Sequence, residues 1–235
     1  MITNNEKRWV MAQEYELEWW SKYSDNIDWY NKFSKIIINK VSPFIDITHD
    51  TNILEIGSGA AGGITYLNSN NKHAIDPLEN YFSAKKKWII HRDKRVKYCV
   101  GKGEQLPFTD NFFDLVILDN VLDHCESPID VLDEINRVIK CGGIIFFRQH
   151  VYNYWGKLMR SFMELFKIDS GHPFTFIKYQ LENYFMERDW DVKRISGVGY
   201  IKTWITNINS FTLKGIIQTL LFITRNRTLF ILEKK

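Results

Sequence analysis

The sequence of 235 residues predicts an α/β protein with a doubly wound, mostly parallel sheet. From Thr51 onward, short apolar segments alternate with segments of helical periodicity, and a parallel sheet with right-handed crossovers buries such an alternation. A glycine-rich turn follows directly after the first apolar segment. Hydrophobic residues make up 45% of the chain and charged residues 25%, the balance of a globular protein.

The order of these segments predicts five strands and the helices between them. The strands are expected at 52–56, 72–76, 96–100, 114–119 and 144–147. A helix through Tyr66 and Leu67 follows the first strand, and a second helix is expected over 78–90. A third is expected over 128–139, with apolar residues at helical spacing and Cys141-Gly142-Gly143 as its end.

The first fifty residues differ from the rest and read as helices. They carry four of the eight tryptophans, and one helix is expected from Trp29 to Val41, where Ser42-Pro43 stops it. Two interpretations stay open: the aromatic side chains pack these helices onto the main domain, which we favour, or part of the segment caps a ligand cleft. The chain thus divides into a helical cap over 1–50 and a main domain over 51–235.

Composition excludes several classes of protein. Lys and Arg number 31 against 28 Asp and Glu, and the basic residues are scattered, so no nucleic-acid surface is expected. The three cysteines, at 99, 125 and 141, include no C-x-x-C pair, which favours reduced thiols in a cytoplasmic protein over a disulfide frame or a metal site. The N-terminus lacks the apolar core of a signal peptide, and the stretch Ile216–Ile223 is too short to span a bilayer.

The glycine-rich turn predicts a nucleotide site. Residues 57–62 fit G-x-G-x-x-G, and Asp76 lies 19 residues after the first glycine, at the end of the second strand. Glycines permit a tight turn and close approach of backbone to a ligand, and an acid at that place can accept both hydroxyls of a ribose. The strand, helix and acid disfavour a merely structural turn, although Gly62 and Gly63 could serve only helix packing.

Five segments carry a resemblance to a known family. Leu54–Gly59 places Glu55 two residues before the first glycine, where nicotinamide enzymes usually have an apolar residue. The segments 103–108, 112–116, 121–124 and 134–143 follow in matching order. Over about Ile53 to Phe147 the chain therefore resembles the class I S-adenosylmethionine-dependent methyltransferases, in the small-molecule branch called methyltransferase type 11.

The resemblance implies a Rossmann-like, seven-stranded sheet with an antiparallel last strand, its final strands at 192–196 and 228–232. It also implies S-adenosylmethionine as cofactor, held at both ends. The implied contacts are Glu55 at the amino end, Gly57, Ser58 and Gly59 along the methionine portion, Asp76 at the ribose, Pro77, Leu78, Gly103 and Glu104 at adenine, and Asp119 and Asn120 at the transfer site. Two positions depart from the family: Lys102 replaces an acid that would accept from adenine, and Cys141 replaces a proline.

Methyl transfer needs a base only if the attacking atom must lose a proton. His150 is the expected candidate because it follows the fifth strand, and His124 and His172 are alternatives. For each histidine a structural role is favoured over catalysis. No metal-ligand arrangement is seen.

Two insertions are expected in the main domain, at about 151–170 and 201–227. In the first, Trp155, Leu158, Met159, Phe162, Met163 and Phe166 form an apolar helix face, either core packing or a lid over the acceptor. The second contains Phe211–Ile223, with Arg225 and Arg227 at its edge. Packing is the default for this segment, and a dimer contact or a membrane-surface helix are the alternatives.

The sequence as a whole predicts methyl transfer to a small-molecule acceptor. A sugar or polysaccharide-pathway intermediate is suggested by a resemblance of the Leu-Asp-His and His-Pro-Phe segments to bacterial relatives of that kind. The alternatives are a non-catalytic protein that binds an adenosyl ligand or a partner, and an NAD-dependent oxidoreductase, which Glu55 disfavours. The sequence indicates no oligomeric state.

Overall fold

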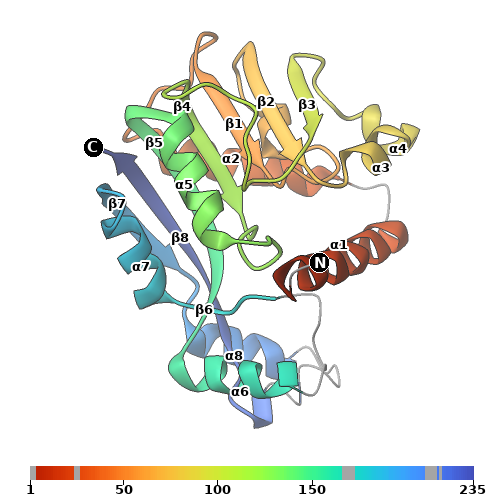
Figure 1. Ribbon diagram of the computed structural model, residues 1–235, viewed down its shortest axis with the longest axis vertical. Coiled ribbons are helices and arrows are strands. Elements are labelled where there is room, and N and C mark those ends of the chain that lie inside the picture. The colour runs from red at the N-terminus through yellow and green to blue at the C-terminus, as the bar shows by residue number, and fades with distance from the viewer. Residues whose placement is uncertain (1–3, 24–26, 166–172, 210–215, 217–218) are drawn as a thin grey trace.

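A mostly parallel sheet organises the fold (Figure 1). The structure is a computed structural model that describes residues 4–23, 27–165, 173–209, 216 and 219–235. Within them, seven strands run in the spatial order β3-β2-β1-β4-β5-β8-β7, and a short strand, β6, pairs with the end of β5. The strands are β1 Asn52–Ile56, β2 Asn71–Asp76, β3 Val96–Val100, β4 Phe113–Asp119, β5 Ile139–Tyr152, β6 Phe176–Ile177, β7 Trp190–Gly197 and β8 Arg225–Lys234.

Strand direction confirms the predicted fold class. β1 pairs in parallel with β2 and β4, β2 with β3, and β4 with β5. β8 pairs antiparallel with both β5 and β7, so it is the antiparallel last strand. The parallel strands bring their carboxyl ends to one edge of the sheet, the edge at which ligands bind in open α/β folds.

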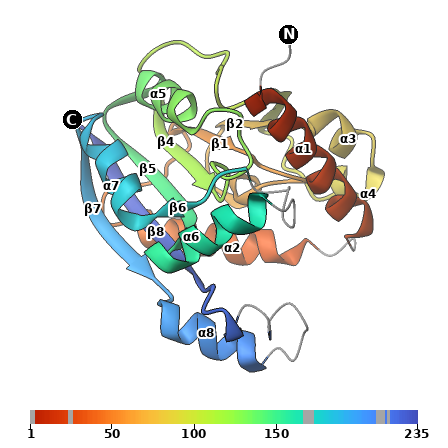
Figure 2. The same ribbon diagram turned by 60° about the horizontal axis from the view of Figure 1, so that its bottom comes forward.

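Helices cover both faces of this sheet (Figures 1 and 2). They are α1 Asn4–Lys22, α2 Asp28–Val41, the 3₁₀ helix η1 Gly63–Tyr66, α3 Glu79–Ser83, α4 Lys86–Ile89, α5 Pro128–Val138, α6 Tyr154–Leu165, α7 Lys178–Met186 and α8 Tyr200–Asn209. In β4, Leu115 and Ile117 join the buried cluster formed with α2, whereas Val116 and Leu118 join the cluster formed with α5 and α7. Because both faces are buried, the strand reads as a continuous apolar run.

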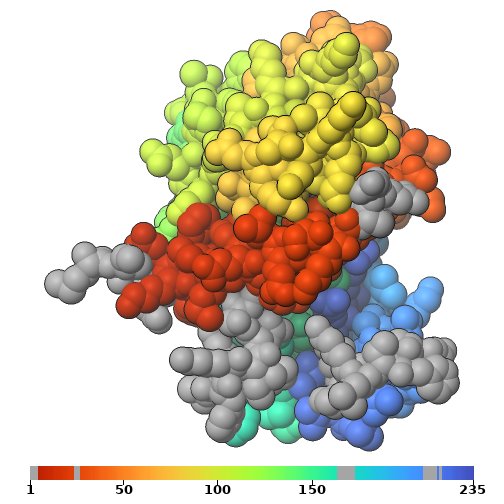
Figure 3. All heavy atoms as spheres, turned by 90° about the vertical axis from the view of Figure 1, so that its right-hand side faces the viewer, coloured from red at the N-terminus to blue at the C-terminus, as the bar shows by residue number. Residues whose placement is uncertain are grey.

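The N-terminal helices form a third buried cluster, at the carboxyl edge of the sheet. The Trp20 ring lies edge-on to Phe82 of α3 and Trp88 of α4, at centroid distances of 5.1 and 5.6 Å. Such aromatic pairs add about 0.5–1.5 kcal/mol each beyond burial. The space-filling view shows α1 as a red band across the molecule, beneath the yellow segment of α3 and α4 (Figure 3).

Several element boundaries differ from the expected ones. The segment after the glycine turn is a single 3₁₀ turn, and the helix expected over 78–90 divides into α3 and α4. α5 ends at Val138, and β5 begins at once, so Cys141-Gly142-Gly143 lies inside the strand instead of ending a helix. The register of β4 and β5 shifts at this place and Gly142 has a φ of +73°, which is the geometry of a bulge.

Both expected insertions contain a helix at the carboxyl edge. α6 follows β5, and α8 follows β7. Most of the segment 211–223, for which a helix was expected, lies outside the described residues, as does Phe166. Among the helices that the structure describes, none is long and apolar enough to cross a membrane.

Candidate functional site

The glycine turn after β1 requires glycine at two positions. Gly57 and Gly59 have φ values of +69° and +60°, in the left-handed region that side chains disfavour. A Cβ on Gly59 would lie 2.7 Å from the Tyr30 hydroxyl and 2.9 Å from the Trp20 ring. Tyr30 in turn donates a hydrogen bond to the carbonyl oxygen of Ser58, at 3.0 Å. The turn is therefore held from outside by the N-terminal helices.

The Glu55 side chain stabilises the same turn through hydrogen bonds. Its buried carboxyl group accepts hydrogen bonds from the backbone nitrogens of Gly63 and Ile64, at 3.2 and 2.8 Å. Burial raises the pKa of Glu55 to about 8, and these two donors offset only part of that rise. A Cβ on Gly62 would lie 2.5 Å from the Glu55 carboxylate, so this glycine is needed for close packing. Glu55 thus organises the loop in addition to lining the site.

Asp76 stands at the carboxyl end of β2 and faces the turn. Its two oxygens accept from the backbone nitrogens of Gly59 and Leu78, each at 2.8 Å. The side chain is buried, and this burial raises the pKa of Asp76 to about 6, against the effect of the two backbone donors. Each carboxylate oxygen has a second lone pair, so Asp76 can accept two further hydrogen bonds from a ligand.

The end of β4 contributes a second polar group. Asp119 pairs with Arg148 of β5, whose Nε lies 2.6 Å from Oδ1 and whose Nη2 contacts Oδ2. Asn120 follows with a φ of +57°, and its Oδ1 accepts from the backbone nitrogen of His150 and from Gln149. These bonds fix the Asn120 amide at the cavity wall.

The N-terminal helices supply residues that the motifs did not identify. Along α1, Trp9, Gln13, Glu16 and Trp20 line the cavity, and from α2 Trp29, Tyr30 and Phe33 do so. The α1 residues recur at intervals of three and four, which places them on one face of the helix. That spacing was a usable signal, but nothing local in the sequence says what the face contacts.

Lys102 cannot serve as the adenine acceptor, and its side chain makes two other contacts. Its ammonium group pairs with Glu126 at 3.0 Å and lies 3.5 Å from the centre of the Trp9 ring. Glu104 accepts from the backbone nitrogens of Glu126 and Ser127, at 2.6 and 3.1 Å. The loop after β3 is therefore tied both to α1 and to the start of α5.

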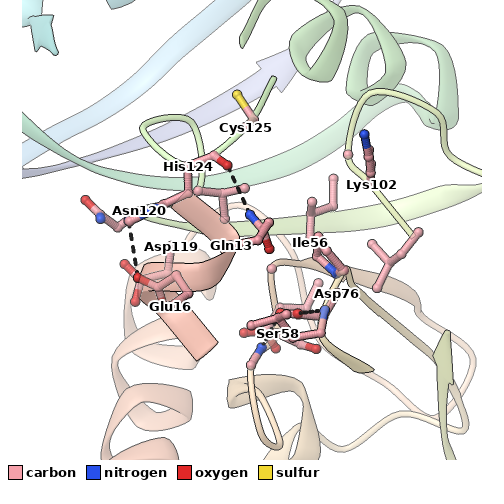
Figure 4. A pocket seen from close by; sticks show the side chains of 18 of the residues that line it. Gln13, Glu16, Ile56, Ser58, Asp76, Lys102, Asp119, Asn120, His124 and Cys125 are labelled. Atoms are coloured by element: carbon pink, nitrogen blue, oxygen red, sulfur yellow. Dashed lines mark hydrogen bonds and ion pairs between the residues drawn. The ribbon is translucent and has the colours of Figure 1, made fainter. Parts of the chain in front are cut away.

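These groups surround one cavity of about 250 Å³ (Figure 4). All eleven residues expected at the cofactor line it: Glu55, Gly57, Ser58, Gly59, Asp76, Pro77, Leu78, Gly103, Glu104, Asp119 and Asn120. The volume lies just under the range of about 300–1,000 Å³ typical of ligand sites. Trp20 and Tyr30, which close on the glycine turn, narrow it.

One buried atom of this cavity points to a ligand. Within the part of the chain that the structure describes, the Ser58 hydroxyl has no hydrogen-bond partner. An unsatisfied buried hydroxyl costs about 1–3 kcal/mol, which a polar ligand would offset. Together with the acceptor capacity of Asp76 and the turn backbone that lines the cavity, this hydroxyl fits a ligand of the adenosyl type.

The three candidate histidines separate clearly. His124 lines the cavity, with Nε2 3.6 Å from Glu16 and 3.8 Å from Asp123. His150 is not among the described residues that line it: β5 continues to Tyr152, so His150 lies within the strand, opposite Arg227 of β8. Burial lowers the pKa of His150 to about 3, and the positive charge of Arg225 is the second cause of this shift. The imidazole is therefore a weak base. His172 lies outside the described residues.

The expected lid does not contribute to the cavity wall. No described residue of α6 lines the cavity, and the Trp155 and Phe162 side chains are exposed. The prediction that this face packs into the core is therefore wrong for Trp155, Leu158 and Phe162. Closure of α6 over an acceptor stays a prediction.

Comparison with known proteins agrees with this site. Residues 54–147 match the family model described as "Methyltransferase domain". The malonyl-[acyl-carrier protein] O-methyltransferase of Marinomonas sp. (strain MWYL1) is 27% identical over 130 residues, which cover 53% of this chain and 47% of that protein. The chain spans about half the length of the curated relatives it matches.

Two solved structures share the fold over most of the chain. A putative sarcosine dimethylglycine methyltransferase from Galdieria sulphuraria has a TM-score of 0.65 at 12% identity, covering 87% of this chain and 86% of that one. An N-methyltransferase of Haemonchus contortus, in complex with phosphomonomethylethanolamine and S-adenosylhomocysteine, has a TM-score of 0.63 at 17% identity, covering 91% and 58%. The match over 54–147 therefore makes this part of the chain similar to a methyltransferase domain, and the two solved structures show that the fold is shared.

Proposed function

We propose that the protein binds S-adenosylmethionine in the cavity beneath α1 and transfers its methyl group to a small polar acceptor. The observation that carries the proposal is the convergence of three groups on one cavity: the glycine turn that lines it, the Asp76 carboxylate, and the Ser58 hydroxyl, which has no hydrogen-bond partner among the described residues. A nicotinamide cofactor would use the same turn, but the family match at 54–147 supports the methyl donor.

The chain's own residues would hold the cofactor along its length. The backbone of Gly57 to Gly59 would receive the methionine portion, and Asp76 would accept from the ribose. When bound, the cofactor supplies a methyl carbon that its sulfonium group has already made electrophilic. The protein therefore has to position the acceptor and exclude water, and α1, which lies across the cavity, serves the exclusion.

His124 is the residue of this cavity best placed to take a proton from the acceptor. Its Nε2 lies 3.6 Å from the Glu16 carboxylate, and a carboxylate at that distance would stabilise the imidazolium formed by proton transfer. The Asp123 carboxylate lies 3.8 Å from the same Nε2 and is itself fixed by Gln149 at 2.9 Å and by Asn120 at 3.1 Å. Two acids therefore approach one nitrogen of the base.

We infer the class of acceptor from the polar side chains on the side of the cavity around His124. Gln13, Glu16, Asn120 and His124 gather there, and they offer both donors and acceptors (Figure 4). Such a wall favours an acceptor that carries hydroxyl or amine groups, and a sugar or sugar-linked intermediate meets that requirement. An oxygen nucleophile of this kind would also need the base that His124 provides.

Thermal unfolding tests the cofactor assignment. Saturation at 100 times Kd adds about 2.7 kcal/mol of stability, which for a chain of this size raises Tm by roughly 5–10 °C. We expect that rise with S-adenosylhomocysteine and S-adenosylmethionine but not with NADH. A rise in Tm with NADH alone would reject S-adenosylmethionine as the cofactor. No rise in Tm with any of the three ligands would show that the cavity does not bind an adenosyl ligand.

A further inference from the structure

α6 presents an apolar face to solvent. Tyr154, Trp155, Leu158 and Phe162 range in exposure from 50% at Trp155 to 73% at Tyr154. The last three recur at intervals of three and four, so they form one stripe along the helix. A helix of a globular protein normally turns such a stripe toward the core. Here the stripe faces outward.

α8 repeats the pattern on the neighbouring insertion. Ile201, Ile205 and Ile208 also lie at intervals of four and three, and Ile201 is 76% exposed. Leu220 and Phe222, which precede β8, are 72% and 61% exposed. Contiguous apolar surface of this kind marks an interaction site on a protein, whereas single exposed apolar residues do not.

Two contacts join these parts into one surface. The Trp155 indole nitrogen donates to the carbonyl oxygen of Leu221, at 2.9 Å. The Trp204 ring of α8 stacks on Phe222, with centroids 6.0 Å apart and an interplanar angle of 4°. Figure 1 shows both α6 and α8 at the foot of the molecule, and Figure 2 shows α8 projecting beyond α6. We call the exposed side chains of α6, α8 and residues 220–222 the α6/α8 surface.

The charge on the α8 side of this surface is of one sign. From residue 192 to residue 232 the sequence contains six Lys and Arg and not a single Asp or Glu. Lys202, Arg225 and Arg227 are exposed. Within the described ranges, no carboxylate forms an ion pair with any of the three. The positive charge is therefore available to an external anionic partner.

We propose that the α6/α8 surface docks on an anionic lipid bilayer. Exposed Trp, Leu, Ile and Phe side chains insert at the boundary between headgroups and acyl chains, and Lys and Arg beside them contact anionic headgroups. A second copy of the chain is disfavoured, because a symmetric contact would bring two cationic surfaces together. The contact is peripheral, since no described helix can span a membrane. It does not depend on methyl transfer.

Flotation with vesicles tests the proposal on the whole 235-residue chain. We expect the protein to float with vesicles of phosphatidylcholine and phosphatidylglycerol, and to float far less with phosphatidylcholine alone or at raised salt. Each Lys or Arg near such a surface adds about 1 kcal/mol, so Lys202→Gln with Arg225→Gln should weaken partitioning by about 30-fold. Leu158→Ser with Ile201→Ser should weaken it by at least about tenfold.

Matched controls separate docking from general effects of charge and hydrophobicity. Lys86→Gln with Lys94→Gln removes two exposed charges near α4, and Ile90→Ser with Met186→Ser removes two exposed apolar side chains elsewhere. Both control pairs should float as the wild type does. Failure of the wild type to float, or equal loss in test and control pairs, overturns the proposal. A dimer in light scattering that Leu158→Ser with Ile201→Ser dissociates would instead assign the surface to a second copy.

Discussion

Replacement of Asp76 by Asn should weaken the adenosyl ligand much more than it weakens the fold. A ribose would donate two hydrogen bonds to the carboxylate, and each hydrogen bond to a charged group contributes about 1.5–3 kcal/mol. Asn keeps one acceptor oxygen and loses the charge. We therefore expect a loss of about 2–4 kcal/mol, which is roughly 30- to 1,000-fold in Kd.

The cost to folding is partly offset. At pH 7 the ionised Asp76 is held in a buried site that raises its pKa from 3.8 to about 6, so its charge lowers stability by about 3 kcal/mol relative to an exposed Asp. Asn removes that charge, but it places an amide hydrogen against one of the two backbone donors, Gly59 or Leu78, which costs about 1–3 kcal/mol. The free energy of unfolding should change little.

The same pKa gives the ligand a pH dependence. The folded protein holds a proton on Asp76 that the unfolded chain releases between pH 4 and 6, so this residue's contribution to stability is full below pH 4 and is lost as pH rises through about 6. Ribose hydroxyls require the ionised acceptor. Affinity for S-adenosylhomocysteine should therefore fall up to tenfold per pH unit below about 6, and Asp76→Asn should lack this dependence.

Isothermal titration with S-adenosylhomocysteine at pH 5 to 8 measures both effects. Asp114→Asn is the matched control, because Asp114 also accepts from backbone, at Asn52, but lies at the opposite end of β4 from the cavity. The control should bind as the wild type does. Wild-type affinity in a folded Asp76→Asn protein would refute the assignment of the ribose to this carboxylate.

Three further predictions concern the glycine turn, the Glu55 carboxylate that supports it, and His124 as the base. Gly59→Ala should lower the free energy of unfolding in urea by about 3 kcal/mol, because φ is positive there and the new Cβ would lie 2.7 Å from the Tyr30 hydroxyl. Gly142→Ala is the control, because Gly142 has a similar φ but open space around it. An equal loss in the control would contradict the clash at Gly59. Because burial raises the pKa of Glu55 to about 8, stability should fall by up to about 1.4 kcal/mol per pH unit from pH 6 to 8, and a slope unchanged in Glu55→Gln would exclude this group. His124→Gln should lower kcat by about 10²–10⁴-fold on an acceptor found with labelled cofactor, at unchanged affinity for S-adenosylhomocysteine, and Glu16→Gln should lower it less; wild-type kcat in His124→Gln would remove it as the base.

The strands and the expected residues of the cavity wall were predictable because their signals are local. Glu55, the glycine turn and Asp76 follow from one strand-turn-helix unit and the next strand end, and each lies within a few residues of the motif that predicts it. The ends of parallel strands meet at one edge of the sheet, so local motifs also predicted that these residues come together.

The parts that could not be predicted depend on contacts between distant segments. The face of α1 that carries Gln13 and Glu16 was visible as a spacing, but its contact with His124, more than 100 residues away, was not. His150 was chosen because the fifth strand was expected to end at 147, and its extension to Tyr152 keeps the side chain among the arginines of β8. Periodicity also predicted the apolar stripe of α6, but periodicity does not tell a core face from a docking face.

A crystal structure of the protein with S-adenosylhomocysteine tests the central claim most directly. We expect the ribose hydroxyls within hydrogen-bond distance of the Asp76 carboxylate, a polar ligand atom on the Ser58 hydroxyl, adenine beside Gly103, and the sulfur facing Asn120 and His124. A ligand bound elsewhere, or one that enters the cavity without contacting Asp76, would contradict the account.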